Sequence, residues 1–149
     1  MGSEMCIRDR ESAGIAVSNG RQILVYKDMG LVSQVFDEST LESLKGHIAI
    51  GHSRYSTTGA STWHNAQPTF RPTADGSIAL GHNGNLINTH DLAQLVADLP
   101  SDPGELDIHA RDLESTNDTG LVTALLAHHP DTSLEQRALE VLPLSLIHI

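Results

Sequence analysis

The spacing of the apolar residues changes once along the chain, close to Asn88. Before Asn88, short runs rich in aliphatic and β-branched residues are typical of strands, at residues 13–18, 22–27, 31–36, 47–52 and 77–82. After it, Leu92, Leu95, Val96 and Leu99 recur at the spacing of an amphipathic helix. Strands that come first and helices that come later favour an α+β fold over alternating βαβ units.

The turns between the strands can also be predicted. Asn19-Gly20 lies between the first two strands and suits the two-residue type I′ turn of a hairpin. The segment 53–75 is rich in Ser, Thr, Pro and Asn, which is the composition of a loop. The acidic segment 98–118 is expected to be a second, solvated loop.

Four helices are predicted from their capping residues. Ser39 and Glu42 form a capping box for a short helix that ends at Gly46, with Leu41 and Leu44 inward. The other three are a helix from Asn88 or Thr89 to Pro100, a helix over 118–128, and a helix from Thr132 with Glu135, which buries Leu134, Ala138, Val141 and Leu142.

Length and charge restrict the class of protein. A chain of 149 residues is long enough for one domain, since domains average about 150 residues. The net charge of -10 disfavours binding to nucleic acid or to anionic membranes. No apolar run approaches the ~20 residues of a membrane helix, and the single cysteine excludes an internal disulfide. A reducing, cytoplasmic location is the simplest expectation.

The two ends of the chain continue none of these patterns. Residues 1–10 (MGSEMCIRDR) and 144–149 (LSLIHI) have neither periodicity nor turn residues. We therefore expect both ends to be non-native, and the natural sequence to run over residues 11–143.

The first of three polar clusters spans 51–59, where a predicted strand meets a loop. Arg54 is followed by the hydroxyl residues Tyr55 and Thr57. A guanidinium group can bind both oxygens of a carboxylate at once, so this cluster could bind a carboxylate. The alternative is a surface arginine beside ordinary Ser/Thr turn residues.

The second and third clusters are 82–86 and 115–119. Asn83 and Gly84 can offer a side-chain donor and a backbone N–H to a developing oxyanion, or can form an ordinary Asn-Gly hairpin turn. Asp118 begins a predicted helix, where it can cap the helix or bind an ammonium group.

The remaining candidate groups do not indicate a metal or a nucleophile. The nine histidines form no His-x-x-x-His or Glu-x-x-His pair on a predicted helix, so no metal site is expected. Cys6 lies in the N-terminal segment and has no base near it in sequence.

Together the three clusters resemble, in order and in kind, the class II glutamine amidotransferase domain of the N-terminal-nucleophile hydrolases. The resemblance rests on Glu11–Val17, Gly51–Gly59, Asn65–Phe70, His82–Leu86 and Thr116–Thr119. It implies an α+β fold with four αββα layers, here incomplete at both ends. The strand with the N-terminal nucleophile and a strand expected after residue 143 have no counterpart.

The same resemblance assigns roles to the site residues. Arg54 would pair with the α-carboxylate of glutamine, with Tyr55 and Thr57 as further binding residues, and Asp118 would bind its α-ammonium group. Asn83 and the Gly84 N–H would hold the oxyanion. The family's nucleophile is an N-terminal cysteine, which this sequence lacks, so the chain by itself is expected to be inactive.

Within the family, the resemblance is strongest to members that carry a second, phosphoribosyltransferase domain. There, ammonia displaces pyrophosphate from phosphoribosyl pyrophosphate at the start of purine synthesis. This implies glutamine and phosphoribosyl pyrophosphate as partners and a homo-oligomeric parent. It also implies magnesium in the transferase domain, an iron–sulfur cluster in some relatives, and no cofactor in this segment. The alternatives are an amidotransferase with another acceptor, or a non-catalytic amino-acid-binding module that keeps Arg54 and Asp118.

Overall fold

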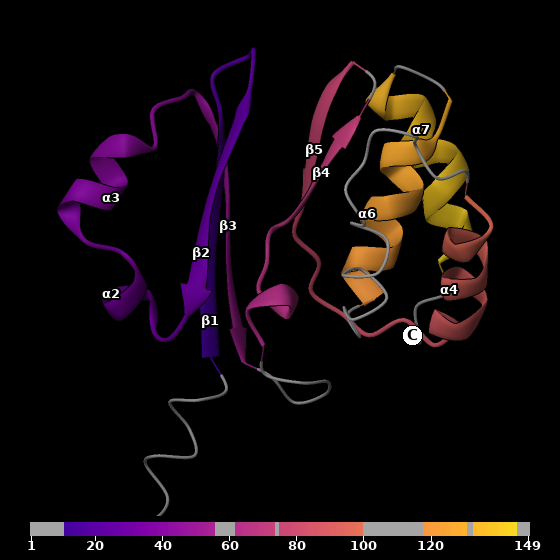
Figure 1. Ribbon diagram of the computed structural model, residues 1–149, viewed down its shortest axis with the longest axis horizontal. Coiled ribbons are helices and arrows are strands. Elements are labelled where there is room, and N and C mark those ends of the chain that lie inside the picture. Colours follow the sequence, from indigo (N-terminus) through magenta and orange to yellow (C-terminus); the bar gives the residue numbers. More distant parts are fainter. Residues whose placement is uncertain (1–10, 56–61, 74, 100–117, 131–132, 146–149) are drawn as a thin grey trace, which may run out of the picture.

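The computed structural model describes residues 11–55, 62–73, 75–99, 118–130 and 133–145 (Figure 1). No helix in this part of the chain is long and apolar enough to cross a membrane. The elements are β1 (Glu11–Ser18), β2 (Ile23–Met29), α2 (Val32–Val35), α3 (Glu38–Ser43), β3 (Ile48–Tyr55), η1 (Trp63–Asn65), β4 (Thr69–Thr73), β5 (Gly76–Leu80), α4 (Thr89–Ala97), α6 (Asp118–His128), α7 (Leu134–Val141) and η2 (Leu142–Leu144).

The first sheet is antiparallel and has the strand order β2-β1-β3. The predicted hairpin is confirmed, but its turn is not of the two-residue type. Ser18 pairs with Ile23, so four residues connect the strands. The Asn19 side chain accepts hydrogen bonds from the N–H groups of Arg21 and Gln22, each at 3.0 Å, and so stabilises the longer loop.

The second sheet is a β4-β5 hairpin, and β4 corrects the prediction that 53–75 is all loop. Arg71 and Pro72 hid this strand in the sequence, because proline cannot donate to a strand ladder. In a two-stranded sheet, however, each strand has one open edge, where a missing N–H costs nothing. The strand β3 likewise continues past the predicted end at His52 to Tyr55.

Four layers follow one another across the molecule (Figure 1). Helices α2 and α3 lie on the outer side of the first sheet, the β4-β5 hairpin faces its other side, and α6 packs on that hairpin with α4 and α7 beside it. The predicted α+β class and αββα layering are confirmed.

The prediction of a strand over residues 31–36 is wrong, because this run contains the short helix α2. Gly30 directly precedes it with φ of 131°, a left-handed value that turns the chain out of β2. The Gln34 side chain then accepts the Leu31 N–H at 3.1 Å, which satisfies a donor at the start of the helix. Alternation of apolar residues over only six positions could not show this local hydrogen bond.

The helix α3 exists, but its cap is Asp37 and not Ser39. The Asp37 carboxylate accepts the Thr40 N–H at 2.7 Å and the Ser39 hydroxyl at 3.0 Å, and these hydrogen bonds lower the pKa of Asp37. Leu41 is half exposed, so the prediction that it faces inward is also wrong. Asp37 is as good an N-cap as serine and lies two residues earlier.

The three later helices agree with the prediction, including the bounds of α6. The cap of α7 is Ser133; the predicted cap, Thr132, lies outside the described residues, as do residues 100–117 of the predicted acidic loop. Leu134 and Leu142 were expected to be buried but are 62% and 47% exposed. Both line an open cavity of about 380 Å³ between the sheets, so they face a gap instead of a packed core.

The main core lies between α6, α4 and the second sheet, and Leu92 is its largest fully buried apolar side chain. We expect Leu92→Ala to lower the free energy of unfolding by about 2–5 kcal/mol, because truncation removes apolar contacts and leaves a cavity. Leu95→Ala on the exposed side of the same helix is the control, with an expected loss of about 1 kcal/mol or less. Denaturant unfolding of both variants measures the difference; equal losses would contradict this position for the core.

Candidate active site

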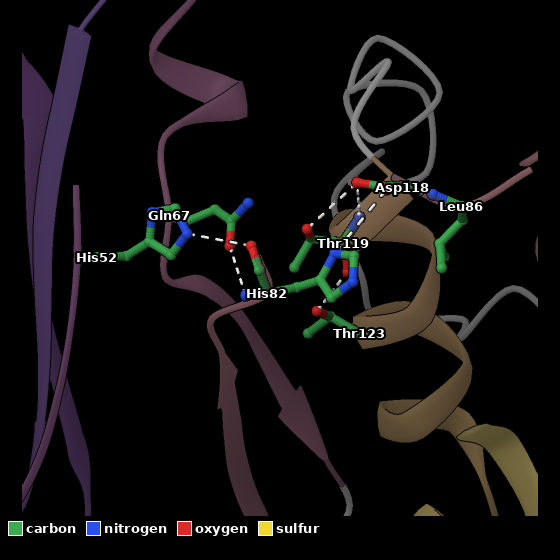
Figure 2. Close-up of polar contacts among 7 residues, drawn as sticks. All are labelled: His52, Gln67, His82, Leu86, Asp118, Thr119 and Thr123. Atoms are coloured by element: carbon green, nitrogen blue, oxygen red, sulfur yellow. Dashed lines mark hydrogen bonds and ion pairs between the residues drawn. The ribbon is translucent and has the colours of Figure 1, made fainter. Parts of the chain in front are cut away.

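A chain of polar contacts connects the first sheet to the start of α6 (Figure 2). His52 comes from β3, Gln67 from the segment before β4, and His82 from the segment after β5. Asp118 is the first residue of α6. These contacts bring together residues of all three polar clusters identified in the sequence.

Both polar groups of the His82 main chain are bound by side chains. Its N–H donates to Gln67 Oε1 at 2.8 Å. Its carbonyl oxygen lies 3.0 Å from His52 Nε2. Because a carbonyl oxygen can only accept, Nε2 of His52 must carry the proton in this contact.

Asp118 accepts hydrogen bonds through both oxygens. Its Oδ2 accepts the Leu86 N–H at 3.0 Å, and its Oδ1 accepts the Thr119 N–H at 2.8 Å. His82 Nδ1 lies 3.9 Å from Oδ2, and the Asp118 side chain is 14% exposed. The carboxylate thus fixes the Leu86 main chain next to the start of α6. The helix dipole favours the negative charge of Asp118 at this position. The Thr119 hydroxyl also donates to Oδ1, at 3.4 Å, so Oδ1 already accepts two hydrogen bonds. Oδ2 accepts one and keeps a second lone pair, which an incoming ammonium group could use.

Asn83 and Gly84 are exposed and lie in the irregular segment between β5 and α4, not in a hairpin turn. The structure therefore contradicts the turn alternative. Gly84 does not need a left-handed backbone here. Instead, a Cβ at this position would lie 2.8 Å from His82 Nε2, so only glycine lets the imidazole pack so closely.

Arg54 and Tyr55 are the last two residues of β3, at the end of the first sheet. Arg54 is partly buried, and Tyr55 is 56% exposed. Side chains two residues apart share one face of a strand, so Arg54 lies on the face that carries His52. The third residue predicted for this cluster, Thr57, lies outside the described residues.

A buried pair of hydroxyl groups connects β4 to α6 next to the site. Thr69 and Thr123 contact through their Oγ1 atoms at 2.6 Å, and Thr123 Oγ1 also donates to the Thr119 carbonyl at 2.7 Å. No role was predicted for Thr69, Gln67 or His52, although all three lie in stretches that carry the family resemblance. The available signal was their position, within or beside polar clusters at the ends of strands.

Lys27 holds the segment that leads into Gln67. Its Nζ donates to the Ala66 carbonyl at 2.7 Å and lies 4.9 Å from the Trp63 ring centroid. Trp63 Nε1 donates in return to the Lys27 carbonyl at 3.0 Å. Burial lowers the pKa of the Lys27 ammonium group. In the described part of the chain, no three His, Cys, Asp or Glu side chains gather as a metal site.

The comparison with known families identifies the class of protein. The family described as glutamine amidotransferases class-II matches residues 3–95, well over half of the chain. The chain belongs to this family.

Within it, the similar curated proteins are amidophosphoribosyltransferases. That of Mycobacterium leprae is 56% identical over 138 residues, which are 91% of this chain and 24% of the relative. That of Mycobacterium tuberculosis H37Rv is 54% identical over 138 residues, with 91% and 25% covered. The chain thus spans about a quarter of the length of these relatives.

Two solved structures show the same fold. One is the glutamine phosphoribosylpyrophosphate amidotransferase from B. subtilis complexed with ADP and GMP, with a TM-score of 0.72 and 29% identity over 96% of this chain and 29% of that one. The other is described as the allosteric regulatory enzyme of purine biosynthesis, with a TM-score of 0.74 and 30% identity over 95% of this chain and 29% of that one. Both support the N-terminal-nucleophile hydrolase fold.

Proposed function

We propose that the chain is part of an amidophosphoribosyltransferase and supplies most of its glutamine-hydrolysing site. The observation that carries this proposal is the 56% identity to such an enzyme over 91% of the chain. The polar contacts that join the three sequence clusters give the proposal a structural basis.

Glutamine would bind by its two charged ends. Arg54, with Tyr55 and Thr57, would bind the α-carboxylate, and Asp118 would bind the α-ammonium group. Asn83 and the Gly84 N–H would then face the side-chain amide. This assignment uses the end of β3, the exposed segment after β5, and the second lone pair of Asp118 Oδ2.

Hydrolysis would start with attack of a thiolate on the amide carbon. The C–S bond forms, and the carbonyl electron pair moves onto oxygen, where Asn83 and Gly84 stabilise it. Collapse of this intermediate breaks the C–N bond, and ammonia leaves after it gains a proton. Water then cleaves the thioester to give glutamate. The thiolate would come from the N-terminal cysteine that is typical of the family, since Cys6 is internal to the sequence.

The released ammonia would displace pyrophosphate from phosphoribosyl pyrophosphate in a phosphoribosyltransferase domain and give 5-phosphoribosylamine. This is the first step of purine synthesis and would take place in the cytoplasm. That domain would supply the magnesium site. We also propose that the parent enzyme is a homo-oligomer.

The function can be tested with the full-length protein that contains this chain. We expect it to release pyrophosphate from phosphoribosyl pyrophosphate with either glutamine or ammonium chloride as nitrogen donor. Release of glutamate and of ammonia without use of phosphoribosyl pyrophosphate would indicate an amidotransferase with another acceptor. Glutamine binding without hydrolysis would indicate the binding module.

We expect Arg54→Lys in the full-length protein to raise the KM for glutamine by about tenfold or more, since an ammonium group cannot bind both oxygens of a carboxylate. The rate with ammonium chloride should not change, because ammonia needs no carboxylate clamp. Arg21→Lys in the hairpin loop is the matched control and should behave as wild type. An equal loss of both activities in Arg54→Lys would show that Arg54 is structural.

A further inference from the structure

We propose that His52 and Gln67 are positioning residues for the oxyanion donors Asn83 and Gly84. The inference rests on the proposed function, because it explains the contacts of His82 through the reaction of the two residues that follow it. Neither His52 nor Gln67 would touch the substrate. Both act through the His82 main chain (Figure 2).

The oxyanion segment has little structure of its own. Residues 81–85 belong to neither helix nor strand, and Asn83 and Gly84 are exposed. A segment without ladder hydrogen bonds keeps one conformation only if other groups hold it. Gln67 Oε1 binds the His82 N–H at 2.8 Å, and His52 Nε2 binds the His82 carbonyl at 3.0 Å. The His82 carbonyl shares its peptide group with the Asn83 N–H, and the peptide group after it carries the Gly84 N–H.

The His52 contact also sets a separation that glutamine hydrolysis requires. His52 lies two residues before Arg54 on the same face of β3, and β3 is paired with β1 along its whole length. One rigid strand therefore carries both the proposed carboxylate clamp and the side chain that binds the oxyanion segment. The contact fixes the distance between the groups for the two ends of glutamine.

Gln67 is itself held firmly. It is 5% exposed, and the preceding carbonyl, of Ala66, accepts a hydrogen bond from Lys27 Nζ at 2.7 Å. Gly14 on β1 lies against the Gln67 carbonyl oxygen so closely that a Cβ there would overlap it. The first sheet thus positions Gln67 as well as His52.

The chemistry of the His52 contact predicts which substitution preserves it. Only Nε2 makes a hydrogen bond; Nδ1 is buried and has no partner in the described part of the chain. Glutamine can place an amide N–H near the position of Nε2, whereas the shorter asparagine cannot reach it. His52→Gln should therefore keep the function that His52→Asn loses.

The experiment compares His52→Asn and His52→Gln in the full-length protein, with His90→Asn as control. His90 is exposed in the first turn of α4. We expect His52→Asn to lower kcat for glutamine hydrolysis by about 10- to 100-fold with little change in KM, because misplaced donors stabilise the transition state less and the ground state equally. His52→Gln should stay within about threefold of wild type. All variants should keep the rate with ammonium chloride.

A double-mutant cycle tests whether His52 acts through Asn83. Asn83→Ala removes one of the two donors that His52 positions and leaves the Gly84 N–H, so His52→Asn should cost clearly less in this background than in wild type. Losses that multiply fully would overturn the inference, and so would an unchanged kcat, a raised KM alone, or equal losses in His52→Asn and His52→Gln.

A general loss of activity in His52→Asn is distinguished from a local effect by a second variant. If His52→Asn also loses the rate with ammonium chloride, Gln67→Met decides, since it removes the other contact with His82 at similar volume; an unchanged kcat in it overturns the inference. A wild-type protein without glutamine hydrolysis would instead overturn the proposed function itself.

Discussion

Asn83→Ala in the full-length protein should lower kcat for glutamine hydrolysis by about 100-fold or more, which is the usual effect of removing one oxyanion donor. The KM for glutamine should change little, because the neutral amide of the ground state needs this donor less than the oxyanion does. Steady-state kinetics with glutamine give both values. The rate with ammonium chloride should equal that of wild type, because it bypasses the amide.

Asn85→Ala is the matched control for this prediction. It lies two residues further in the same exposed segment, and no role in the reaction is proposed for it. We expect it to keep kcat near the wild-type value. A raised KM with unchanged kcat in Asn83→Ala would place Asn83 in ground-state binding and would contradict its role at the oxyanion.

Asp118→Asn should lower kcat/KM for glutamine by about 100-fold, chiefly through KM. The substitution removes the charge that would pair with the α-ammonium group, and a hydrogen bond to a charged group contributes about 1.5–3 kcal/mol. The N–H groups of Leu86 and Thr119 each donate to a different carboxylate oxygen. In asparagine an NH₂ group replaces one of these oxygens, so one backbone N–H would face another donor. Glutamine binding by calorimetry, beside steady-state kinetics, would measure the loss.

Asp91→Asn serves as the control for Asp118→Asn. Asp91 is an acidic residue in the first turn of the neighbouring helix α4 and is exposed. Its substitution changes the net charge equally and should leave glutamine binding unchanged. A similar loss of affinity in both variants would show that overall charge matters and that Asp118 is only a helix cap.

Elements with a long, regular pattern could be predicted from the sequence. The helix α6 has the predicted bounds, and α4 starts after the predicted cap Asn88. The helix α4 follows its apolar period, with Leu92 and Val96 buried. The helix α6 is buried on nearly all sides and has no such period; its bounds follow from Asp118 at its start and from Pro130 after its end. The prediction of short elements fails where one hydrogen bond decides between two structures. The Gln34 side chain makes residues 32–35 helical, and Asp37 displaces Ser39 as the cap of α3.

Candidate site residues can be proposed from the sequence where the chemistry of a side chain is visible in its type. An arginine, an aspartate and an Asn-Gly pair can be recognised as candidate groups without coordinates. His52 and Gln67 could not be assigned a role, because they contact the main chain of His82, which lies 30 and 15 residues away. The sequence does not show such distances. The alternative of an ordinary hairpin turn at Asn83-Gly84 could likewise be excluded only from the structure, because within the described residues β5 pairs with β4 alone.

The most direct test of the proposed site follows the nitrogen atom of the product. Full-length protein would receive amide-¹⁵N glutamine at about the wild-type KM, together with unlabelled ammonium chloride and phosphoribosyl pyrophosphate. The isotope in the trapped amine product would be measured by mass spectrometry. We predict that wild type transfers the labelled amide nitrogen, whereas Asp118→Asn and Asn83→Ala form mostly unlabelled product at a preserved rate from ammonium. Product that is as strongly labelled in both variants as in wild type would contradict the assignment of these residues to glutamine hydrolysis.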